Sequence, residues 1–349
     1  MKQNFRILLL VLLLGFTQPP SEDAFDVAMG SKTKHWAHIE KQVDLEDLST
    51  YRALFHRNIP LVQSAKGAVK IPKTVHFIWL GPRPFPPQSV SNVRSWIAQN
   101  PDWTFKFWTD RPREAPCRGM ETILIKEYPF PNLGRCYAAS DNWGEKSDIL
   151  RFEILFKEGG VYVDHDASCL TPFEPYHRAY AFYAGLETPH PDFAGRNITA
   201  GNGVIGSAPS HLVIQKVIEL IDQRWDALAE KYSDNDHFSK TQIVMERTYM
   251  ALTDALKTTL DPASKTDIVF PASYFFPKKG LKPVLSEHFF ANSWAAPAAT
   301  DTFEKETRQS ITKIEKRYDR INYIQFAALG VNLLLIGFGL FFLRKKRTS

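Results

Sequence analysis

Cysteine is scarce in this chain, with only Cys117, Cys136 and Cys169 among its 349 residues. Their spacing matches no zinc-binding pattern, and an odd number of cysteines cannot form a complete disulfide framework. One disulfide bridge and three free thiols are both compatible with the sequence, so cysteine usage does not identify the compartment. The chain also has no internal repeat and no low-complexity segment, which excludes repeat architectures.

An excess of charge of one sign is nearly absent as well. The net charge is +5, the pI is near 8.9, and much of the positive excess lies at the C-terminal end. Since no basic-aromatic stripe or nucleic-acid-binding motif accompanies this charge, we expect no nucleic acid partner. Hydrophobic residues make up 44% of the chain, and its 25 Phe and 8 Trp supply material for one large catalytic domain with appendages.

Long apolar runs occur only at the two ends of the chain. Near the N-terminus, Lys2 and Arg6 precede an apolar run of about ten residues, which predicts a signal-like or short anchor segment over residues 1–20. A buried first helix is the alternative. Residues 324–343 are twenty residues without a charge, and as a helix they would span about 30 Å, the thickness of a bilayer core. We therefore expect a transmembrane helix.

The basic tail that follows this apolar run favours a cytoplasmic C-terminus, because positive charge accumulates on the cytoplasmic side. The chain is then a single-pass membrane protein anchored near its C-terminus, with a luminal or extracytoplasmic catalytic domain. In a eukaryotic lumen, Asn197-Ile-Thr199 would be an N-glycosylation acceptor. The predicted segments are a helical and polar segment at 21–68, the catalytic domain at 69–298, a charged stalk at 299–320, the transmembrane helix at 321–343 and the tail at 344–349.

Within the catalytic domain, strand-like and helix-like segments alternate. Strands are predicted at 74–80, 103–108 and 161–163, and helices at 89–99, with Ser89 as a possible N-cap, and at 147–157. This alternation predicts an α/β fold with a mostly parallel central sheet. Ligands of such sheets bind at the carboxyl ends of the strands.

The last of these strands runs directly into Asp164-His165-Asp166. Side chains two residues apart on an extended segment point to the same side, so the two carboxylates can converge on one cation, whereas His165 should point away. Carboxylates suit Mg²⁺ and Mn²⁺, which proteins commonly share with substrate phosphates. Asp-x-Asp also occurs in ordinary solvated loops, but here it follows a helix, Gly159-Gly160 and an apolar strand.

The segment from Ser147 to Asp166 resembles the signature of the DXD-containing glycosyltransferases in its pattern Ser-Asp148-x-x-Arg151, Gly159-Gly160-Val-Tyr162-Val-Asp164-His-Asp166. That group includes the yeast initiating mannosyltransferases, the inositol-phosphoceramide mannosyltransferases and the catalytic domains of large clostridial glucosylating toxins. The resemblance spans roughly residues 70–295. It implies a GT-A type nucleotide-sugar-binding fold, a divalent metal ion and retention of anomeric configuration.

The resemblance also implies roles for ten residues. Residues near the transferred sugar are Asp148, Arg151 and Asn202; residues near the donor nucleotide and diphosphate are Trp79, Tyr162, Asp164, Ser293 and Trp294; metal ligands are Asp166, His288 and, through a bound water, Asp164. Each has a structural alternative: a core position for Trp79 and Tyr162, a local ion pair for Asp148 and Arg151, a turn for Asn202, and a surface or capping position for His288.

The predicted activity is transfer of a hexose from a UDP- or GDP-linked sugar to a hydroxyl of a membrane-proximal glycan or glycolipid, with Mn²⁺ or Mg²⁺ stabilising the leaving diphosphate. A catalytically inactive sugar-binding protein of the same fold need not keep Asp148, Arg151, Asp164 and Asp166 together. A Mg-dependent phosphoester hydrolase would need further Asp, Glu or His clusters for a second metal. A calcium module would need a longer series of oxygen ligands.

Overall fold

A computed structural model describes residues 23–233 and 237–291. The predicted segment 1–20, the stalk, the transmembrane helix and the tail lie outside the described residues, and so do Ser293 and Trp294. Within the described ranges, no helix combines the length and the apolar character needed to cross a bilayer.

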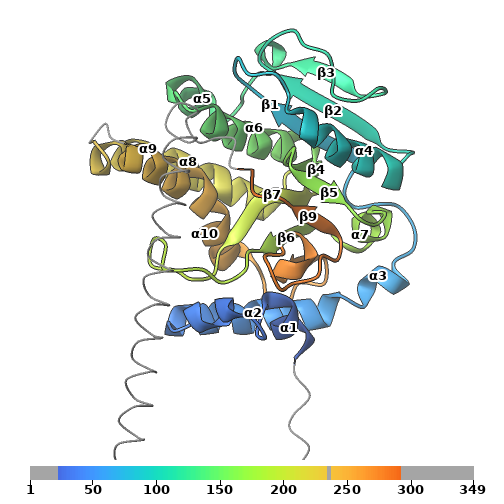
Figure 1. Ribbon diagram of the computed structural model, residues 1–349, viewed down its shortest axis with the longest axis vertical. Helices are drawn as coiled ribbons and strands as arrows, with labels where there is room; N and C mark the ends of the chain where they lie inside the picture. Colours follow the sequence, from blue (N-terminus) through green and yellow to red (C-terminus); the bar gives the residue numbers. More distant parts are fainter. Residues whose placement is uncertain (1–22, 234–236, 292–349) are drawn as a thin grey trace, which may run out of the picture. The chain divides into compact units, whose positions relative to one another are not determined.

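The described part of the chain is organised around a seven-stranded sheet of order β3-β2-β1-β4-β7-β6-β8 (Figure 1). Strand β7 is antiparallel to both of its neighbours, and every other pairing is parallel. The predicted α/β fold with a mostly parallel central sheet is therefore confirmed. The strands are β1 (Thr74–Trp79), β2 (Thr104–Thr109), β3 (Glu121–Leu124), β4 (Gly160–Val163), β6 (Phe182–Leu186), β7 (Ala200–Ser207) and β8 (Asp267–Phe270).

Strands β1 and β2 form the first parallel pair, joined through helix α4 (Val90–Gln99). Five of the six residues of β1 are buried, as expected for a strand covered on both faces. The predicted strands and helix agree with these elements to within about one residue. Ser89 is different, because its side chain caps no helix and instead hydrogen-bonds the ring of His165.

Helix α6 (Trp143–Glu158) leads into β4 and packs against β1, β4 and β7. It begins four residues before the predicted start, because the Asn142 side chain accepts hydrogen bonds from the backbone N–H groups of Gly144 (2.8 Å) and Glu145 (3.1 Å). After the helix, Gly160 has φ +96°, and a Cβ there would lie 2.7 Å from the carbonyl oxygen of Thr74. Only glycine allows β4 to start this close to β1.

The C-terminal half supplies a helical layer that packs against α6 and β7. Its members are α8 (Leu212–Lys231), α9 (His237–Val244), the π-helical turn η4 (Met245–Tyr249) and α10 (Met250–Thr259). Apart from α2, the remaining helices are α1 (Ala24–Met29), α3 (Leu61–Ser64), α5 (Gly134–Ala139), α7 (Glu174–Ala179) and the 3₁₀ turns η1 (Lys34–His38), η2 (Pro87–Ser89), η3 (Ile125–Glu127) and η5 (Ala272–Tyr274).

Helix α2 (Gln42–Asn58), from the predicted N-terminal segment, packs on the edge strand β8. The Asn58 side chain donates hydrogen bonds to the carbonyl oxygens of Ser264 (2.8 Å) and Asp267 (2.7 Å). The described part of segment 21–68 thus belongs to the same compact unit as the sheet.

The structure also bears on the glycosylation sequon at Asn197 and on the three cysteines. Asn197 is only 6% exposed, and its side-chain amide donates to the carbonyl oxygen of His190 at 2.9 Å. Thr199 is fully buried. The burial of Asn197 leaves no room for a glycan in the folded chain, which argues against this sequon as an acceptor. All three cysteines are free thiols.

Buried His76 on β1 makes stability depend on pH. Its Nε2–H donates to the carbonyl oxygen of Gly159 (2.9 Å), and its Nδ1 accepts from the indole N–H of Trp108 (3.1 Å), so the ring is neutral. Burial lowers the pKa of His76 to about 4, below the unfolded value of about 6.5. The folded state therefore keeps its full stability above the pKa of the unfolded chain. It loses stability as the pH falls from there towards the pKa of His76 in the folded chain.

We expect His76 to remove about 2 kcal/mol from the free energy of unfolding between about pH 7 and about pH 5. Urea unfolding of the wild type and of His76→Gln at both pH values measures this loss. The variant should be less stable at neutral pH but lose less stability on acidification. An equal loss in both proteins would contradict the prediction.

Candidate active site

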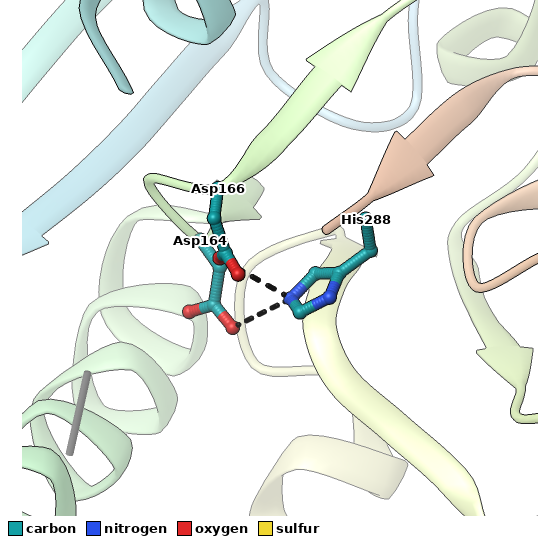
Figure 2. Close-up of side chains that lie close together, drawn as sticks. All are labelled: Asp164, Asp166 and His288. Carbon is teal, nitrogen blue, oxygen red and sulfur yellow. Dashed lines mark hydrogen bonds and ion pairs between the residues drawn. The ribbon is translucent and has the colours of Figure 1, made fainter. Parts of the chain in front are cut away.

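Three candidate metal ligands meet at the carboxyl end of β4. Asp164, Asp166 and His288 each offer a ligand atom, and these atoms lie within 4.8 Å of one another. The Nε2 atom of His288 lies 3.3 Å from Oδ2 of Asp164 and 3.4 Å from Oδ1 of Asp166 (Figure 2). The structure thus brings together the three residues for which the resemblance implied a metal role.

His288 reaches this position through a second, two-stranded sheet. Strand β5 (Ala167–Cys169) pairs antiparallel with β9 (Ser286–His288), and the register places His288 opposite Ala167, beside Asp166. The segment after β9 continues around Asp166. The backbone N–H of Ala291 donates to Oδ2 of Asp166 at 2.6 Å, and that of Phe289 donates to the Asp166 carbonyl oxygen at 2.9 Å.

The protonation state of His288 follows from its other ring nitrogen. Its Nδ1 accepts a hydrogen bond from the backbone N–H of Phe290 at 3.1 Å, so the ring proton is on Nε2 and faces the two carboxylates. Metal ligation by Nε2 requires its lone pair. The proton would then have to leave Nε2, and a proton on Nδ1 would break the contact with Phe290. The carboxylates therefore fit a metal as they stand, whereas His288 fits after a local adjustment.

Space and charge at this position also fit a divalent cation. A Cβ added to Gly203 on β7 would lie 2.8 Å from Oδ2 of Asp164 and 2.9 Å from Nε2 of His288, so the missing side chain keeps the volume beside both atoms open. Asp148 and Asp164 pair with the guanidinium of Arg151, which also acts electrostatically on Asp166, and no other arginine or lysine pairs with these three carboxylates among the described residues. With the imidazole of His288 neutral, two of the three carboxylate charges have no opposite charge to balance them.

Arg151 connects the candidate metal ligands to helix α6 and strand β7. Its side chain is 5% exposed, and its Nη2 lies 2.6 Å from Oδ1 of Asp148 and 3.5 Å from Oδ1 of Asp164. Its Nη1 donates to the carbonyl oxygen of Asn202 at 2.5 Å, and the guanidinium lies 4.1 Å from the ring centre of Tyr162. The side chain of Asn202 also hydrogen-bonds Asp148. The local ion pair considered as an alternative exists, and it is part of the site.

The pKa values of these groups are set by two opposing effects: burial disfavours the charged form, and a partner of opposite charge favours it. Burial raises the pKa of Asp148 despite Arg151 and Thr248. For Asp164, burial is outweighed by Arg151, His288 and the Tyr162 hydroxyl at 2.5 Å, which together hold its pKa well below the usual range. Burial opposes protonation of His288, yet the carboxylates raise its pKa. Burial raises the pKa of Tyr162, so this residue acts as a hydrogen-bond donor.

Trp79 and His165 lie together beside the site rather than in it. Trp79 is 7% exposed, its indole N–H donates to the carbonyl oxygen of Arg83 at 2.9 Å, and its ring centre lies 4.9 Å from that of His165. The Nδ1 atom of His165 is bonded to the Ser89 hydroxyl at 2.8 Å. The ring of His165 thus lies against Ser89 and Trp79. Trp79 remains a prediction for base stacking, with its ring largely covered in this structure.

Two site residues were missed by sequence reasoning. Gly203 directly follows Asn202 in the sequence, but the space that it leaves open is defined by Asp164 and His288, which lie far from it along the chain. The Thr248 hydroxyl lies 2.5 Å from Oδ2 of Asp148 and belongs to the π-helical turn η4, for which the sequence has no signature. The adjacent Arg247 lies 3.5 Å from Glu145, so the turn contacts α6 at two points.

We expect Gly203→Ala to abolish Mn²⁺ binding, because the added methyl group would fill the space between Asp164 and His288 without removing a ligand. Calorimetric titration with Mn²⁺ measures this. The control is Gly134→Ala, at a position that like Gly203 has no positive φ, where the added Cβ has one neighbour, the Cβ of Phe130 at 3.3 Å. Normal Mn²⁺ affinity in the Gly203 variant would show that the ion does not bind here.

We expect Thr248→Val to lower kcat/KM for donor cleavage about tenfold, because hydrogen bonds to charged groups contribute about 1.5–3 kcal/mol. Without the hydroxyl, Asp148 and hence Arg151 lose their orientation. Thr248→Ser should restore the activity. Thr258→Val on α10, whose hydroxyl bonds only helix carbonyls, is the control and should be unaffected. Equal activity of the Thr248→Val variant and the wild type would contradict this role.

Comparison with known proteins finds a match for one part of the site. The sequence profile described as "Glycosyltransferase sugar-binding region containing DXD motif" matches residues 86–183. "Subversion of eukaryotic traffic protein A" of Legionella pneumophila is 30% identical over 45% of this chain and 26% of its own length. "Mannosyl phosphorylinositol ceramide synthase CSH1" of Saccharomyces cerevisiae is 31% identical over 43% of this chain and 35% of its own length. The chain thus spans about a quarter to a third of these curated relatives.

Among solved structures, the "PaToxG Glycosyltransferase" is similar with a TM-score of 0.43 and 16% identity, over 61% of this chain and 78% of that one. A similarity of this size adds no functional argument. The matched profile contains Asp148, Arg151, Asp164 and Asp166. The resemblance inferred from the sequence is therefore confirmed: residues 86–183 match the profile of the DXD-motif glycosyltransferases.

Proposed function

We propose that this protein is a metal-dependent, retaining glycosyltransferase of the GT-A type that moves a hexose from a nucleotide-diphosphate sugar to an acceptor hydroxyl. The observation that carries the proposal is the convergence of Asp164, Asp166 and His288 beside the buried Arg151. This arrangement offers oxygen and nitrogen ligands for a divalent ion and a guanidinium for an anionic donor within one site.

The metal-binding side of the site would hold the donor diphosphate. Asp166 and Asp164, with His288 after its adjustment, would hold Mn²⁺ or Mg²⁺, which supplies Lewis-acid stabilisation of the charge that develops on the leaving diphosphate. Ser293 and Trp294 are proposed to close over the diphosphate.

The helix side of the site would hold the transferred sugar. Asp148 and Asn202 offer an acceptor and a donor for sugar hydroxyls, and Arg151 lies between them and the carboxylates of the metal site. A fixed guanidinium at this position would also offset the negative charge of the departing group. We assign no general base, since no second carboxylate pair of the glycosidase kind accompanies the site among the described residues.

The donor and acceptor are proposed from the relatives and from the sequence. Names among the curated relatives include mannosyl transfer and phosphorylinositol ceramide, so a GDP-linked mannose and a glycolipid acceptor stand first among the candidates, ahead of UDP-linked sugars. A membrane-proximal acceptor agrees with the predicted membrane anchor over residues 321–343. A membrane location with a luminal or extracytoplasmic catalytic domain stays part of this proposal.

The proposal is tested by donor cleavage. Purified protein with Mn²⁺ is incubated with a panel of GDP- and UDP-linked sugars, including GDP-mannose, and release of the nucleoside diphosphate is measured. We expect one donor to be cleaved by the wild type and cleavage to fall to background in Asp166→Ala. Asp226→Ala, which removes a carboxylate whose side chain is 75% exposed and paired with Arg135, is the matched control.

The same assay separates the alternatives. Donor binding without cleavage in the presence of any acceptor would indicate an inactive sugar-binding protein. Release of inorganic phosphate from simple phosphate esters, with no sugar transferred, would indicate a phosphoester hydrolase. Full metal-dependent activity in Asp166→Ala would contradict the assignment of the metal site.

A further inference from the structure

A chain of four hydrogen-bonding side chains passes through the connection between strands β6 and β7. The Tyr249 hydroxyl shares a hydrogen bond with the carboxylate of Glu187 and lies 2.7 Å from the hydroxyl of Thr199. The Thr199 hydroxyl in turn lies 2.9 Å from Nε2 of His190. We propose that this chain carries the proton lost by the acceptor hydroxyl from Glu187 to solvent at His190, an inference that rests on the function proposed above.

Glu187 is the end of the chain that faces the metal side of the site. It directly follows β6, and its side chain is 15% exposed. Burial opposes protonation of His288, and Glu187 is one of the carboxylates that raise the pKa of this histidine. The Lys278 ammonium lies 3.7 Å from Oε2 of Glu187 and 5.2 Å from the ring centre of Phe290. The ring of Phe290 lies 4.6 Å from that of His288, so these contacts lead from Glu187 to the candidate metal ligands.

The chain also touches the sugar side of the site. Tyr249 belongs to the π-helical turn η4 and directly follows Thr248, whose hydroxyl bonds Asp148 at 2.5 Å. Glu187 and its hydrogen-bond partner Tyr249 are therefore connected both to the residues proposed for the metal and to those proposed for the transferred sugar. An acceptor hydroxyl has to approach the donor at the junction of these two sides.

The three contacts of the chain need one proton more than its two hydroxyls supply. Each contact requires one hydrogen atom, and Tyr249 and Thr199 contribute one each. The Nδ1 atom of His190 lies 2.8 Å from the carbonyl oxygen of Pro191, which can only accept, so Nδ1 carries a proton and Nε2 can accept or donate. The third proton is then either on the carboxyl group of Glu187 or on Nε2 of His190. These two arrangements differ only by a shift of one proton through both hydroxyls.

Such a chain fits the proton balance of glycosyl transfer, which the function proposed above leaves without a proton recipient. The O–H bond of the acceptor breaks and its oxygen bonds the anomeric carbon, while the bond from that carbon to the diphosphate breaks and leaves its electron pair on the diphosphate. The proton passes to the carboxylate of Glu187. Each hydroxyl then takes up one proton and passes another on, and the half-buried His190 releases one proton to water. Burial raises the pKa of Tyr249 well above its usual value, so its hydroxyl relays the proton without remaining ionised.

The backbone around the chain keeps its members in place. The N–H of Glu187 donates to the carbonyl oxygen of Thr199 at 2.8 Å, and the N–H of His190 donates to that of Asn197 at 3.1 Å. Asp44 on α2 accepts from the N–H of Asn197 at 3.1 Å. Thr199 is fully buried. Because these contacts involve the backbone, they do not depend on the Thr199 hydroxyl or the His190 ring, and both can be removed without removing the contacts.

The test is donor cleavage with water as the acceptor, because water loses a proton in the same way and the natural acceptor need not be known. The donor is the sugar nucleotide of the panel that the wild type cleaves. We expect kcat to fall about 100-fold in Glu187→Gln and in Tyr249→Phe, with unchanged affinities for GDP and UDP in the presence of Mn²⁺. Thr199→Val should behave like Tyr249→Phe, whereas Thr199→Ser keeps the hydroxyl and should retain the activity.

His190→Ala gives a readout that is specific for proton transfer. Its kcat should be lower than that of the wild type and should rise as imidazole is added to the buffer, because free imidazole can take the proton from Thr199. The matched control is His56→Ala, which removes a histidine paired with Asp23 and should show no imidazole effect. Tyr232→Phe removes a hydroxyl that bonds Glu246 and is the control for the tyrosine.

Thermal unfolding of each variant shows whether it is folded. Wild-type kcat in Tyr249→Phe or Glu187→Gln would overturn the inference, and so would a loss in His190→Ala that imidazole does not change. A fall in kcat matched by an equal fall in nucleotide affinity would show a purely structural role and overturn it as well. If the wild type cleaves no donor of the panel, the proposed function itself fails, so the two failures are distinguishable.

Discussion

The structure depends on the burial of one cation, the guanidinium of Arg151. A charged group with 5% exposure is stable only if it is paired and hydrogen-bonded. Its partners come from three different elements: Asp148 from the same helix, Asp164 from the end of β4, and the carbonyl oxygen of Asn202 from β7. These contacts of Arg151 therefore fix α6, β4 and β7 relative to one another, and they also position the carboxylates that are candidate metal ligands.

The reversed strand β7 makes this arrangement possible. Because β7 runs antiparallel to β4, with Val163 opposite Val204, its first residues lie beside the last residues of β4. A parallel strand would place its amino end at the opposite edge of the sheet. The reversal thus brings Asn202 to Arg151 and the open volume at Gly203 to Asp164, where the N–H of Asp164 also donates to the carbonyl oxygen of Gly203 at 2.8 Å.

The part of the site that the sequence predicts is the part encoded locally. One continuous segment contains helix α6, the two glycines, strand β4 and the carboxylates that follow it. Apolar periodicity and the rule that ligands bind at the carboxyl ends of strands are therefore sufficient to predict it. His288 could be suggested only by resemblance, because β9 is a three-residue strand without an apolar run and its position depends on pairing with β5. Thr248 could not be found, since a π-helical turn has no sequence signature. The helix start at Trp143 depends on the Asn142 cap, which the apolar periodicity of residues 147–157 does not reveal.

The free-energy cost of burying several carboxylates together is an argument that they serve a function. Asp148, Asp164 and Asp166 have side-chain exposures of 12%, 24% and 9%, and one arginine does not neutralise them. Replacing buried ionic groups by apolar residues of similar size is often neutral or stabilising in proteins, so stability alone does not account for three such carboxylates in one place. A divalent cation would remove the imbalance and restore the hydrogen-bonding and charge requirements of the group. A protein that only bound sugar through hydroxyl contacts would need Asp148 and Asn202, but it would not need the concentrated negative charge at the end of β4.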